Sequence, residues 1–311
     1  MPIVLGSNTS PDFTSRLQQA GVSTLDPKHA QQQDIRPAKI GLFNLMPAAA
    51  MEATELQWLS RIATTPILQI EVFLIKFDND RREDPDRSRS KLLKSYRPLS
   101  EIKDFGLDGL IVTGDNQEIK RNNKSFSSRL INPAELPLYE LEYYDKLKEL
   151  VRWADSNVSS TIYSCLGAHF ALNCLYGLRR GIGAEKTFGV FNHDIINPGL
   201  FMEGMGDHAT SPHSRWGNIP TRQIETQSDI DILALNERIG WLALQRVNSG
   251  GGHDLLLQGH PEYGKYDLQK EAGRDGVETY EGSSEGYCWP SDAGMLHANW
   301  INYVYNKYSM E

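Results

Sequence analysis

The sequence predicts an α/β protein whose mostly parallel sheet is covered by helices on both faces. Short runs of apolar residues recur along the chain, and each of them ends near Gly, Asn, Asp or Cys. Segments with apolar residues at helical spacing lie between these runs. A strand buried on both faces is apolar throughout, and alternation of such strands with amphipathic helices is typical of a parallel sheet.

Four apolar runs predict the first strands, at residues 39–45, 68–77, 108–114 and 160–165. Two helices are expected beside them, because apolar residues recur there at helical spacing. The first helix follows the first strand and has its apolar positions at Leu56, Leu59, Ile62 and Ala63. The second precedes the fourth strand and has its apolar positions at Leu147, Leu150, Val151 and Ala154.

Three later runs, at residues 229–236, 240–247 and 254–263, predict an antiparallel extension of the same sheet. The glycine-rich NSGGG lies between the last two runs. We expect it to be a turn, because a phosphate-binding loop would precede a helix. The charge-dense segment 78–90 is expected to be a solvated loop.

The predicted organisation is an N-terminal arm over residues 1–36, which are polar and irregular, followed by a single α/β domain over residues 37–311. The chain of 311 residues is 40% hydrophobic and 23% charged, which is ordinary for a globular protein. Its formal net charge of −8 argues against nucleic acid and anionic membrane as partners.

The cysteine content predicts a reducing compartment. The three cysteines, Cys165, Cys174 and Cys288, lack the paired spacing of a disulfide framework or a zinc site, so we expect no bound metal. No apolar run approaches the roughly 20 residues that span a bilayer. The first residues also lack the pattern of a signal peptide. We therefore expect a cytoplasmic enzyme or binding protein.

Three residues at predicted strand ends suggest nucleophilic catalysis. Cys165 ends one strand and begins a small-residue turn, while His260 and Glu262 end another strand. The NLMP loop, which follows the first strand, is a third feature at these strand ends. Ligands of open parallel sheets bind at the carboxyl ends of the strands. A cysteine nucleophile needs a base, and the base needs an acceptor that orients it. His260 and Glu262 would face the same side of an extended segment.

Each of these residues also has an ordinary structural explanation. A single cysteine is often a packed core thiol, a single histidine is often a hydrogen-bonded structural residue, and a single glutamate is often exposed. Their joint occurrence favours a Cys165–His260–Glu262 triad. We expect Cys174 to be a packing residue. His193, His208 and His213 show no metal-ligand spacing and are expected to be structural or close to the substrate.

The segments SCLGAHFA and QGHPEY resemble the nucleophile turn and the His-Pro-Glu pair of class I glutamine amidotransferases. A more specific resemblance, to the homoserine O-succinyltransferase/O-acetyltransferase family, covers most of the chain from about residue 35. It rests on six segments that occur in order: KIGLFNLMP, DGLIVTG, ALNCLYG, AEKTFGVFNH, SPHSRW and GHPEY.

This resemblance implies a flavodoxin-like, class I glutamine amidotransferase-like fold and acyl transfer in two steps. Cys165 would take an acyl group from acyl-CoA, and an amino-acid hydroxyl would then remove it. His260 would be the base and Glu262 its partner. The resemblance further assigns substrate binding to Lys186, Ser214, Glu271 and Arg274. It assigns the choice of acyl group to Glu118, whose charge would favour acetyl-CoA over succinyl-CoA.

The chain departs from the family pattern around the expected pocket. Lysines usually follow NLMP in the family, whereas Ala48, Ala49 and Ala50 stand here. This change is expected to remove a cation from beside the nucleophile. The usual TGAP is TGDN, and the partly basic segment 119–138 is longer than the family norm. That segment is a lid, a contact for a CoA phosphate or an exposed loop.

The most favoured function is therefore an acetyl-CoA-dependent O-acyltransferase for a small hydroxy amino acid. L-homoserine is the first choice of acceptor, in methionine or cysteine supply or in a specialised pathway. The alternatives are L-serine or another hydroxy amino acid as acceptor, succinyl-CoA as donor, a glutaminase-type amidohydrolase, and a non-catalytic relative that binds ligands. We expect acyl-CoA as a co-substrate and no permanently bound cofactor, and we allow for a homodimer.

Overall fold

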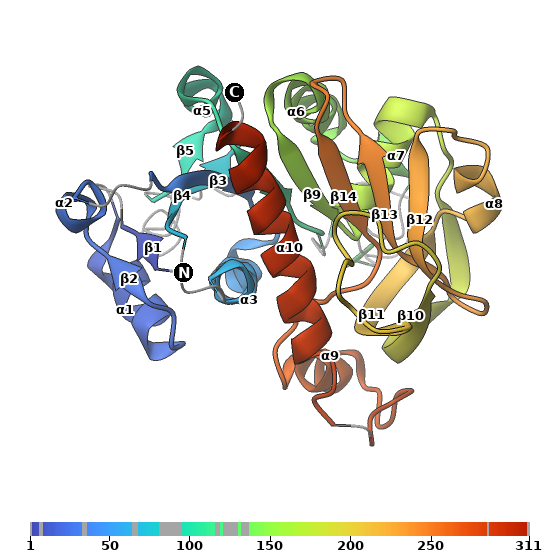
Figure 1. The fold of residues 1–311 in the computed structure, drawn as a ribbon. Coiled ribbons are helices and arrows are strands. Elements are labelled where there is room, and N and C mark those ends of the chain that lie inside the picture. Colours follow the sequence, from blue (N-terminus) through green and yellow to red (C-terminus); the bar gives the residue numbers. More distant parts are fainter. Residues whose placement is uncertain are drawn as a thin grey trace.

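The computed structural model describes residues 2–5, 9–32, 36–63, 68–80, 95–115, 119–120, 130–131, 137–284 and 286–309. Its centre is one twisted sheet of twelve strands (Figure 1). The parallel part runs in the order β2–β1–β4–β3–β6–β9–β14, with β5 added beside β4. The bounds of these strands are β1 Ile3–Val4, β2 Thr24–Leu25, β3 Ala38–Phe43, β4 Ile70–Lys76, β5 Arg97–Pro98, β6 Gly109–Val112, β9 Ser160–Ser164 and β14 His253–Leu257.

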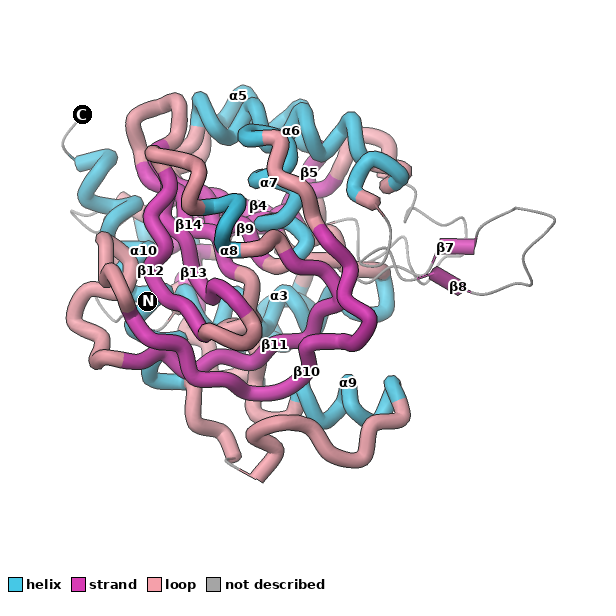
Figure 2. The backbone as a smooth tube through the Cα atoms, turned by 90° about the vertical axis from the view of Figure 1, so that its right-hand side faces the viewer, coloured by secondary structure: helices cyan, strands magenta, loops and turns pink. Residues whose placement is uncertain are grey.

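An antiparallel part continues the sheet from β14 in the order β13–β12–β10–β11. Its strands are β10 Gly181–Ile195, β11 His208–Asn218, β12 Ile230–Asn236 and β13 Gly240–Val247. Figure 2 shows β10 and β11 curving away as a long ribbon that approaches α9 (Asp267–Asp275). A separate hairpin pairs β7 (Ile119–Lys120) with β8 (Leu130–Ile131).

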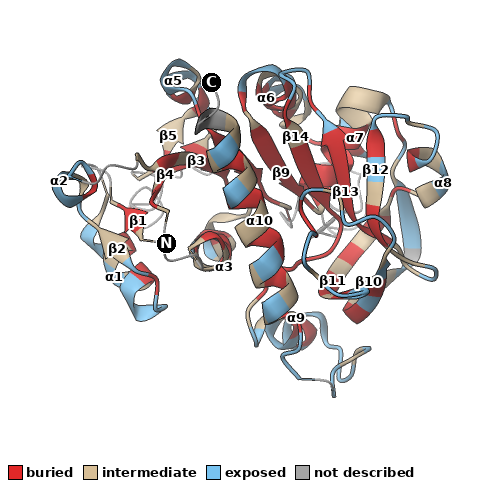
Figure 3. Cartoon of the chain, in the orientation of Figure 1, coloured by how far each residue is buried: buried red, intermediate tan, exposed pale blue. Residues whose placement is uncertain are grey.

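Helices cover both faces of the parallel part. Apolar residues of α1 (Pro11–Gln19), α3 (Ala48–Ile62) and α10 (Pro290–Ser309) form the core on one face. On the other face the core comes from α5 (Leu99–Phe105), α6 (Tyr144–Asn157) and α7 (Leu166–Tyr176). Figure 3 shows the central strands as buried and the outer side of α10 as exposed. The shorter helices are α2 Pro27–Ala30, α8 Thr221–Ile224 and the 3₁₀ helix η2 Leu138–Glu140.

These layers confirm the predicted α/β class, and the predicted antiparallel extension needs one correction. The run that contains β14 pairs antiparallel with β13 but parallel with β9, so it is the joint between the two parts. Strands β10 and β11 were not predicted from the sequence. Their residues mix polar, glycine and aromatic types, because one face of an outer ribbon is only partly buried.

The N-terminal segment, which we expected to be an arm, lies against the α/β domain wherever it is described. Strand β1 pairs with β4, and β2 pairs with β1. Phe13 and Leu17 of α1 are buried in the core beside α3. The two apolar positions are four residues apart and therefore lie on one face of the helix, which the overall polarity of the segment obscured.

Two expectations fall on residues that are only partly described. The segment 78–90 is described as far as residue 80. Of the long segment 119–138, only the β7–β8 pairs and residues 137–138 are described. The NSGGG stretch is a turn between β13 and β14, where the Asn248 side chain accepts a 2.7 Å hydrogen bond from the Gly252 N–H.

Candidate active site

Cys165 occupies a sharp turn between β9 and α7. Its φ of +49° and ψ of −109° make it the only non-glycine residue with positive φ among the described residues. Such a conformation costs on the order of 1–3 kcal/mol and is held by its surroundings. The Cys165 N–H donates a 2.7 Å hydrogen bond to Leu257 of β14, which fixes the turn to the neighbouring strand.

Two glycines leave room for this turn. A Cβ on Gly167 would lie 2.9 Å from the Val112 carbonyl oxygen, so the first turn of α7 packs directly on the end of β6. A Cβ on Gly114 would lie 3.3 Å from that of Cys165. The small residues in SCLGAHFA and DGLIVTG are thus needed for the approach of three chain segments at the thiol.

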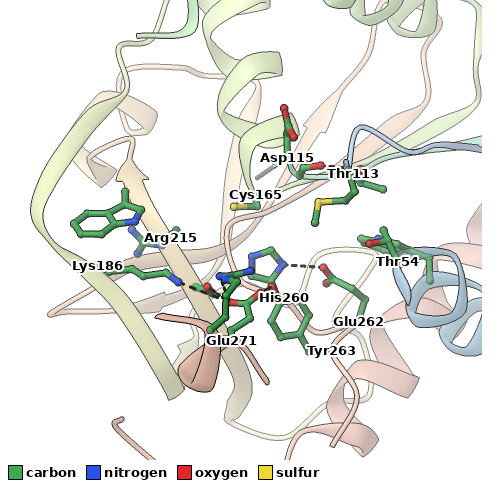
Figure 4. A pocket seen from close by; sticks show the side chains of 16 residues that line it. Thr54, Thr113, Asp115, Cys165, Lys186, Arg215, His260, Glu262, Tyr263 and Glu271 are labelled. Carbon is green, nitrogen blue, oxygen red and sulfur yellow. Dashed lines mark hydrogen bonds and ion pairs between the residues drawn. The ribbon is translucent and has the colours of Figure 1, made fainter. Parts of the chain in front are cut away.

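His260 and Glu262 lie together next to Cys165 (Figure 4). Nδ1 of His260 donates to Oε1 of Glu262 across 2.8 Å, and both side chains are buried. The imidazole therefore keeps Nε2 for the thiol. A turn after β14, rather than the extended segment that we expected, brings the two residues together, since the Tyr263 N–H donates to the His260 carbonyl across 3.1 Å.

The electrostatics favour a thiolate paired with an imidazolium. Burial raises the pKa of the Cys165 thiol, but the charge and hydrogen bond of His260, together with the charges of Arg180 and Arg215, leave that pKa below its ordinary value. Burial lowers the pKa of His260, but the charges of Glu262 and Cys165 raise it well above the ordinary range. A thiolate at neutral pH is the form that attacks a carbonyl carbon.

The first turn of α7 supplies a donor for a developing oxyanion. Leu166 is the first residue of the helix, so its N–H has no acceptor within the helix. This nitrogen lies 3.9 Å from the Cβ position built on Gly114, next to the thiol. A backbone N–H at a helix N-terminus stabilises negative charge on a carbonyl oxygen during attack.

A second group of polar side chains surrounds the carboxylate of Glu271 on α9. Tyr263 donates to Oε1 across 2.7 Å, and Ser214 of β11 donates to Oε2. Nζ of Lys186, on β10, lies 3.8 Å from Oε2. Three predicted substrate-binding residues, Lys186, Ser214 and Glu271, are therefore brought together in the wall of the same cleft as Cys165.

Arg274 lies at the edge of this group. Its Nη2 is 3.9 Å from Oε2 of Glu271, and its Nε donates across 2.7 Å to Asp275. Asp275 also accepts a 2.7 Å hydrogen bond from Lys186. The segment is a helix in spite of its internal Gly273, and Gly276, with φ of +70°, ends it. The sequence analysis did not anticipate Asp275 as a partner of both cations.

The cleft contains about 600 Å³ of space that no protein atom fills, part of it open to solvent. Several residues that line the cleft had no role predicted for them individually: Met46, Thr54, Trp58, Thr113, Asp115, Arg215, Trp216 and Tyr263. All of them except Thr54 and Trp58 lie in segments that had drawn attention in the sequence: Met46 in KIGLFNLMP, Thr113 and Asp115 in TGDN, Arg215 and Trp216 in SPHSRW, and Tyr263 in GHPEY.

The nucleophile has cationic neighbours even though alanines follow NLMP. Ala48, Ala49 and Ala50 form the first turn of α3. Arg215, buried in the cleft wall, donates from Nε to Nδ1 of His213 across 3.2 Å and from Nη1 to the Gly217 carbonyl across 3.0 Å. Burial lowers the pKa of Arg215 to about 10, which still leaves a positive charge at neutral pH.

The remaining predicted residues take different positions. Cys174 packs against the core, as expected for a packing residue. His193 and His213 are buried with ring centroids 5.0 Å apart, whereas His208 is exposed and lies 2.8 Å from Asp194. Glu118 lies outside the described residues.

Two other features are absent from the described part of the chain. No group of three or more His, Cys, Asp or Glu residues in that part could hold a metal ion. None of its helices is long and apolar enough to cross a membrane.

The chain is similar to known proteins over most of its length. Residues 2–310 match the family model described as homoserine O-succinyltransferase. The chain is 31% identical over 303 residues to the homoserine O-succinyltransferase of Pseudoalteromonas translucida (strain TAC 125), covering 93% of this chain and 89% of that protein. It is also 31% identical over 301 residues to the homoserine O-acetyltransferase of Lachnoclostridium phytofermentans, covering 92% of each.

Among solved structures, a protein of Thermoplasma acidophilum that is provisionally described as part of a GMP synthase has a TM-score of 0.51 at 14% identity. The match covers 89% of this chain and 99% of that one. At this identity the likeness concerns the fold alone.

Proposed function

The chain belongs to the homoserine O-succinyltransferase family, and from this premise we propose that it transfers an acetyl group from acetyl-CoA to the hydroxyl of L-homoserine through a thioester on Cys165. It is an acyltransferase enzyme, and acyl transfer to homoserine agrees with the relatives of both names. The observation that carries the mechanism is the Cys165–His260–Glu262 arrangement in one cleft with the Glu271 group.

In the first step, the Cys165 thiolate attacks the carbonyl carbon of acetyl-CoA. The carbonyl oxygen gains negative charge, which the Leu166 N–H stabilises. The tetrahedral intermediate then collapses, the bond to the CoA sulfur breaks, and His260 gives its proton to the leaving CoA thiolate. The enzyme is left with an acetyl thioester on Cys165 and a neutral imidazole that Glu262 keeps oriented.

In the second step, Nε2 of His260 takes the proton from the hydroxyl of homoserine as its oxygen attacks the thioester carbonyl. The bond to Sγ breaks, the ester leaves, and the thiolate–imidazolium pair is restored. General-base help of this kind contributes roughly 10²–10⁴-fold. The two steps share the same oxyanion donor, so one arrangement of the backbone serves both.

The Glu271 group supplies complementary charges for the amino acid. The carboxylate of Glu271 would accept the ammonium group, and Arg274, with Lys186 and Ser214, would bind the carboxylate. Both cations contact Asp275 in the structure, so the substrate carboxylate competes with Asp275 for them. Homoserine is longer than serine by one methylene, and a hydroxyl misplaced by about 1 Å loses on the order of 10²-fold in rate.

Acetyl-CoA is proposed as donor on grounds of charge. The resemblance assigns acyl selection to Glu118, and the buried Asp115 adds a carboxyl group to the cleft wall beside Cys165. A succinyl group carries its own carboxylate. Two like charges at about 4 Å repel by about 4 kcal/mol at an effective dielectric of 20, nearly three factors of ten in rate. Glu118→Gly should therefore raise the use of succinyl-CoA relative to acetyl-CoA.

Intact-protein mass spectrometry after separate incubation with acetyl-CoA, succinyl-CoA and glutamine tests the proposal. We expect a mass increase of one acetyl group with acetyl-CoA, and none in Cys165→Ala. A preferred succinyl adduct would overturn the donor, while glutamine hydrolysis that depends on Cys165 would favour an amidohydrolase. Steady-state kinetics with homoserine and serine then identify the acceptor, and serine with the higher kcat/KM would overturn homoserine.

We also propose that the enzyme supplies methionine biosynthesis in the cytoplasm and needs no permanently bound cofactor. Its small number of cysteines supports a reducing compartment. Analytical ultracentrifugation of the full chain tests whether it is a homodimer. Activity of protein purified in the presence of a chelator and without added cofactor tests the last point.

A further inference from the structure

We propose that Tyr263 couples the two halves of the site: its ring stabilises the protonated form of His260, and its hydroxyl holds the carboxylate of Glu271 in position for the acceptor. This inference rests on the proposed function, because it gives one residue a part in both steps of the acyl transfer. Tyr263 acts through His260 and Glu271, and it is therefore a positioning residue.

The first observation is the stacking of two rings. The ring of Tyr263 lies against the imidazole of His260, with centroids 4.4 Å apart and planes inclined by 19°. Both residues are buried. A cation over the face of a tyrosine ring is attracted by the negative charge of that face, and the attraction is strongest where water is excluded. The stack therefore favours the imidazolium that must form when Cys165 is a thiolate.

The second observation concerns the other end of the same side chain. The Tyr263 hydroxyl donates to Oε1 of Glu271 across 2.7 Å (Figure 4). Ser214 donates to Oε2. Both carboxylate oxygens thus have a fixed neutral donor. A carboxylate held by two hydroxyl groups keeps its negative charge in a defined place, which an ammonium group of the acceptor requires.

The backbone of Tyr263 is itself fixed from two directions. Its carbonyl oxygen accepts from Nη2 of Arg61 on α3 across 2.7 Å and from Nε1 of Trp289 across 2.9 Å. Its N–H donates to the His260 carbonyl across 3.1 Å. These bonds fix the backbone from which the Tyr263 side chain extends between His260 and Glu271.

The ring and the hydroxyl can be removed separately, and the effect on Cys165 and the effect on the acceptor can be measured separately. Tyr263→Phe keeps the stack and removes the hydrogen bond to Glu271. Tyr263→Leu removes both. Tyr266→Phe is the matched control, because Tyr266 is a nearby tyrosine that is more than half exposed and outside the cleft.

The first readout is the pH dependence of Cys165 alkylation by iodoacetamide, which needs no substrate. The second is kcat/KM for the acceptor at saturating acetyl-CoA. For Tyr263→Phe we expect the alkylation midpoint of the wild type and a kcat/KM for homoserine lower by roughly tenfold, as for loss of a hydrogen bond to a charged group. For Tyr263→Leu we expect, in addition, an alkylation midpoint about one pH unit higher.

Several results would overturn the coupling. A wild-type kcat/KM in Tyr263→Phe removes the role of the hydroxyl, and a wild-type alkylation midpoint in Tyr263→Leu removes the role of the ring. If Tyr263→Phe shifts the alkylation midpoint as well as lowering kcat/KM, the residue is merely structural. If Tyr263→Leu does not fold, Tyr263→Met replaces it.

The failure of this inference can be told apart from the failure of the proposed function. If the wild type forms no thioester with any acyl-CoA, the acyl transfer itself is wrong. The alkylation profile of Tyr263→Leu would still test the stacking on His260 in that event.

Discussion

Removing the charge of Glu262 tests the electrostatic origin of the thiolate most directly. Glu262→Gln keeps the shape of the side chain but places a neutral group 2.8 Å from Nδ1 of His260. The new amide can also donate to Nδ1, which would force the proton of a neutral imidazole onto Nε2. His260 could then no longer take a proton from the acceptor hydroxyl.

The size of the effect follows from the geometry. Two unit charges 2.8 Å apart attract by about 6 kcal/mol at an effective dielectric of 20, which sets an upper limit of about four pKa units on the contribution of Glu262 to His260. Because His260 stabilises the thiolate, loss of the imidazolium raises the pKa of Cys165. We expect the alkylation midpoint to move upward by at least about one pH unit and turnover to fall by about 10³–10⁴-fold.

The assay is the rate of iodoacetamide modification against pH in a chain that also carries Cys174→Ala and Cys288→Ala, so that only Cys165 reacts. Glu149→Gln is the matched control, since this glutamate is exposed and pairs with Lys103 on the surface. An alkylation midpoint in Glu262→Gln equal to that of the control, with the fold intact by circular dichroism, would refute the reasoning.

Three further predictions concern stability and the geometry of the turn. Cys165→Gly should unfold at a higher temperature than Cys165→Ala, because glycine relieves about 1 kcal/mol or more of strain at φ of +49°; equal melting temperatures would show that there is no strain. Gly259→Ala should lower kcat strongly while the melting temperature changes little. The added methyl group would lie within 2.9 Å of three side chains and displace the adjacent His260, so wild-type kcat would contradict this prediction. The buried His297 stacks edge-on against Trp58, and burial lowers its pKa to about 4. Because the folded protein disfavours protonated His297, the free energy of unfolding should fall by up to about 3 kcal/mol as the pH drops from about 6.5 toward 4. Denaturant unfolding of His297→Phe should show a smaller fall over that range than the wild type. An equal fall in both would contradict this assignment.

The parallel core and the residues Cys165, His260 and Glu262 could be predicted from the amino-acid sequence. Strands buried on both faces must be apolar throughout, and this local requirement is visible in any window of the chain. Cys165 follows β9, and His260 and Glu262 follow β14, so the ends of two neighbouring strands bring them to the same edge of the sheet. The turn after β14 then sets the contact between His260 and Glu262. The small residues around Cys165 likewise record the close approach of its neighbours.

The positions of residues on partly exposed elements, by contrast, became evident only from the folded structure. Strands β10 and β11 carry Lys186, Ser214 and Arg215, but their mixed composition does not predict a ribbon over the cleft. The same holds for strands β1 and β2 at the edge of the sheet, because the N-terminal segment that contains them is polar overall.

Asp275 pairs with Lys186, which lies 89 residues away in the chain. Glu271 likewise accepts a hydrogen bond from Ser214, which lies 57 residues away. A local sequence pattern reflects interactions between residues that are close together in the chain. Which distant partner satisfies a polar side chain depends on the packing of whole elements, and only the folded chain establishes that packing.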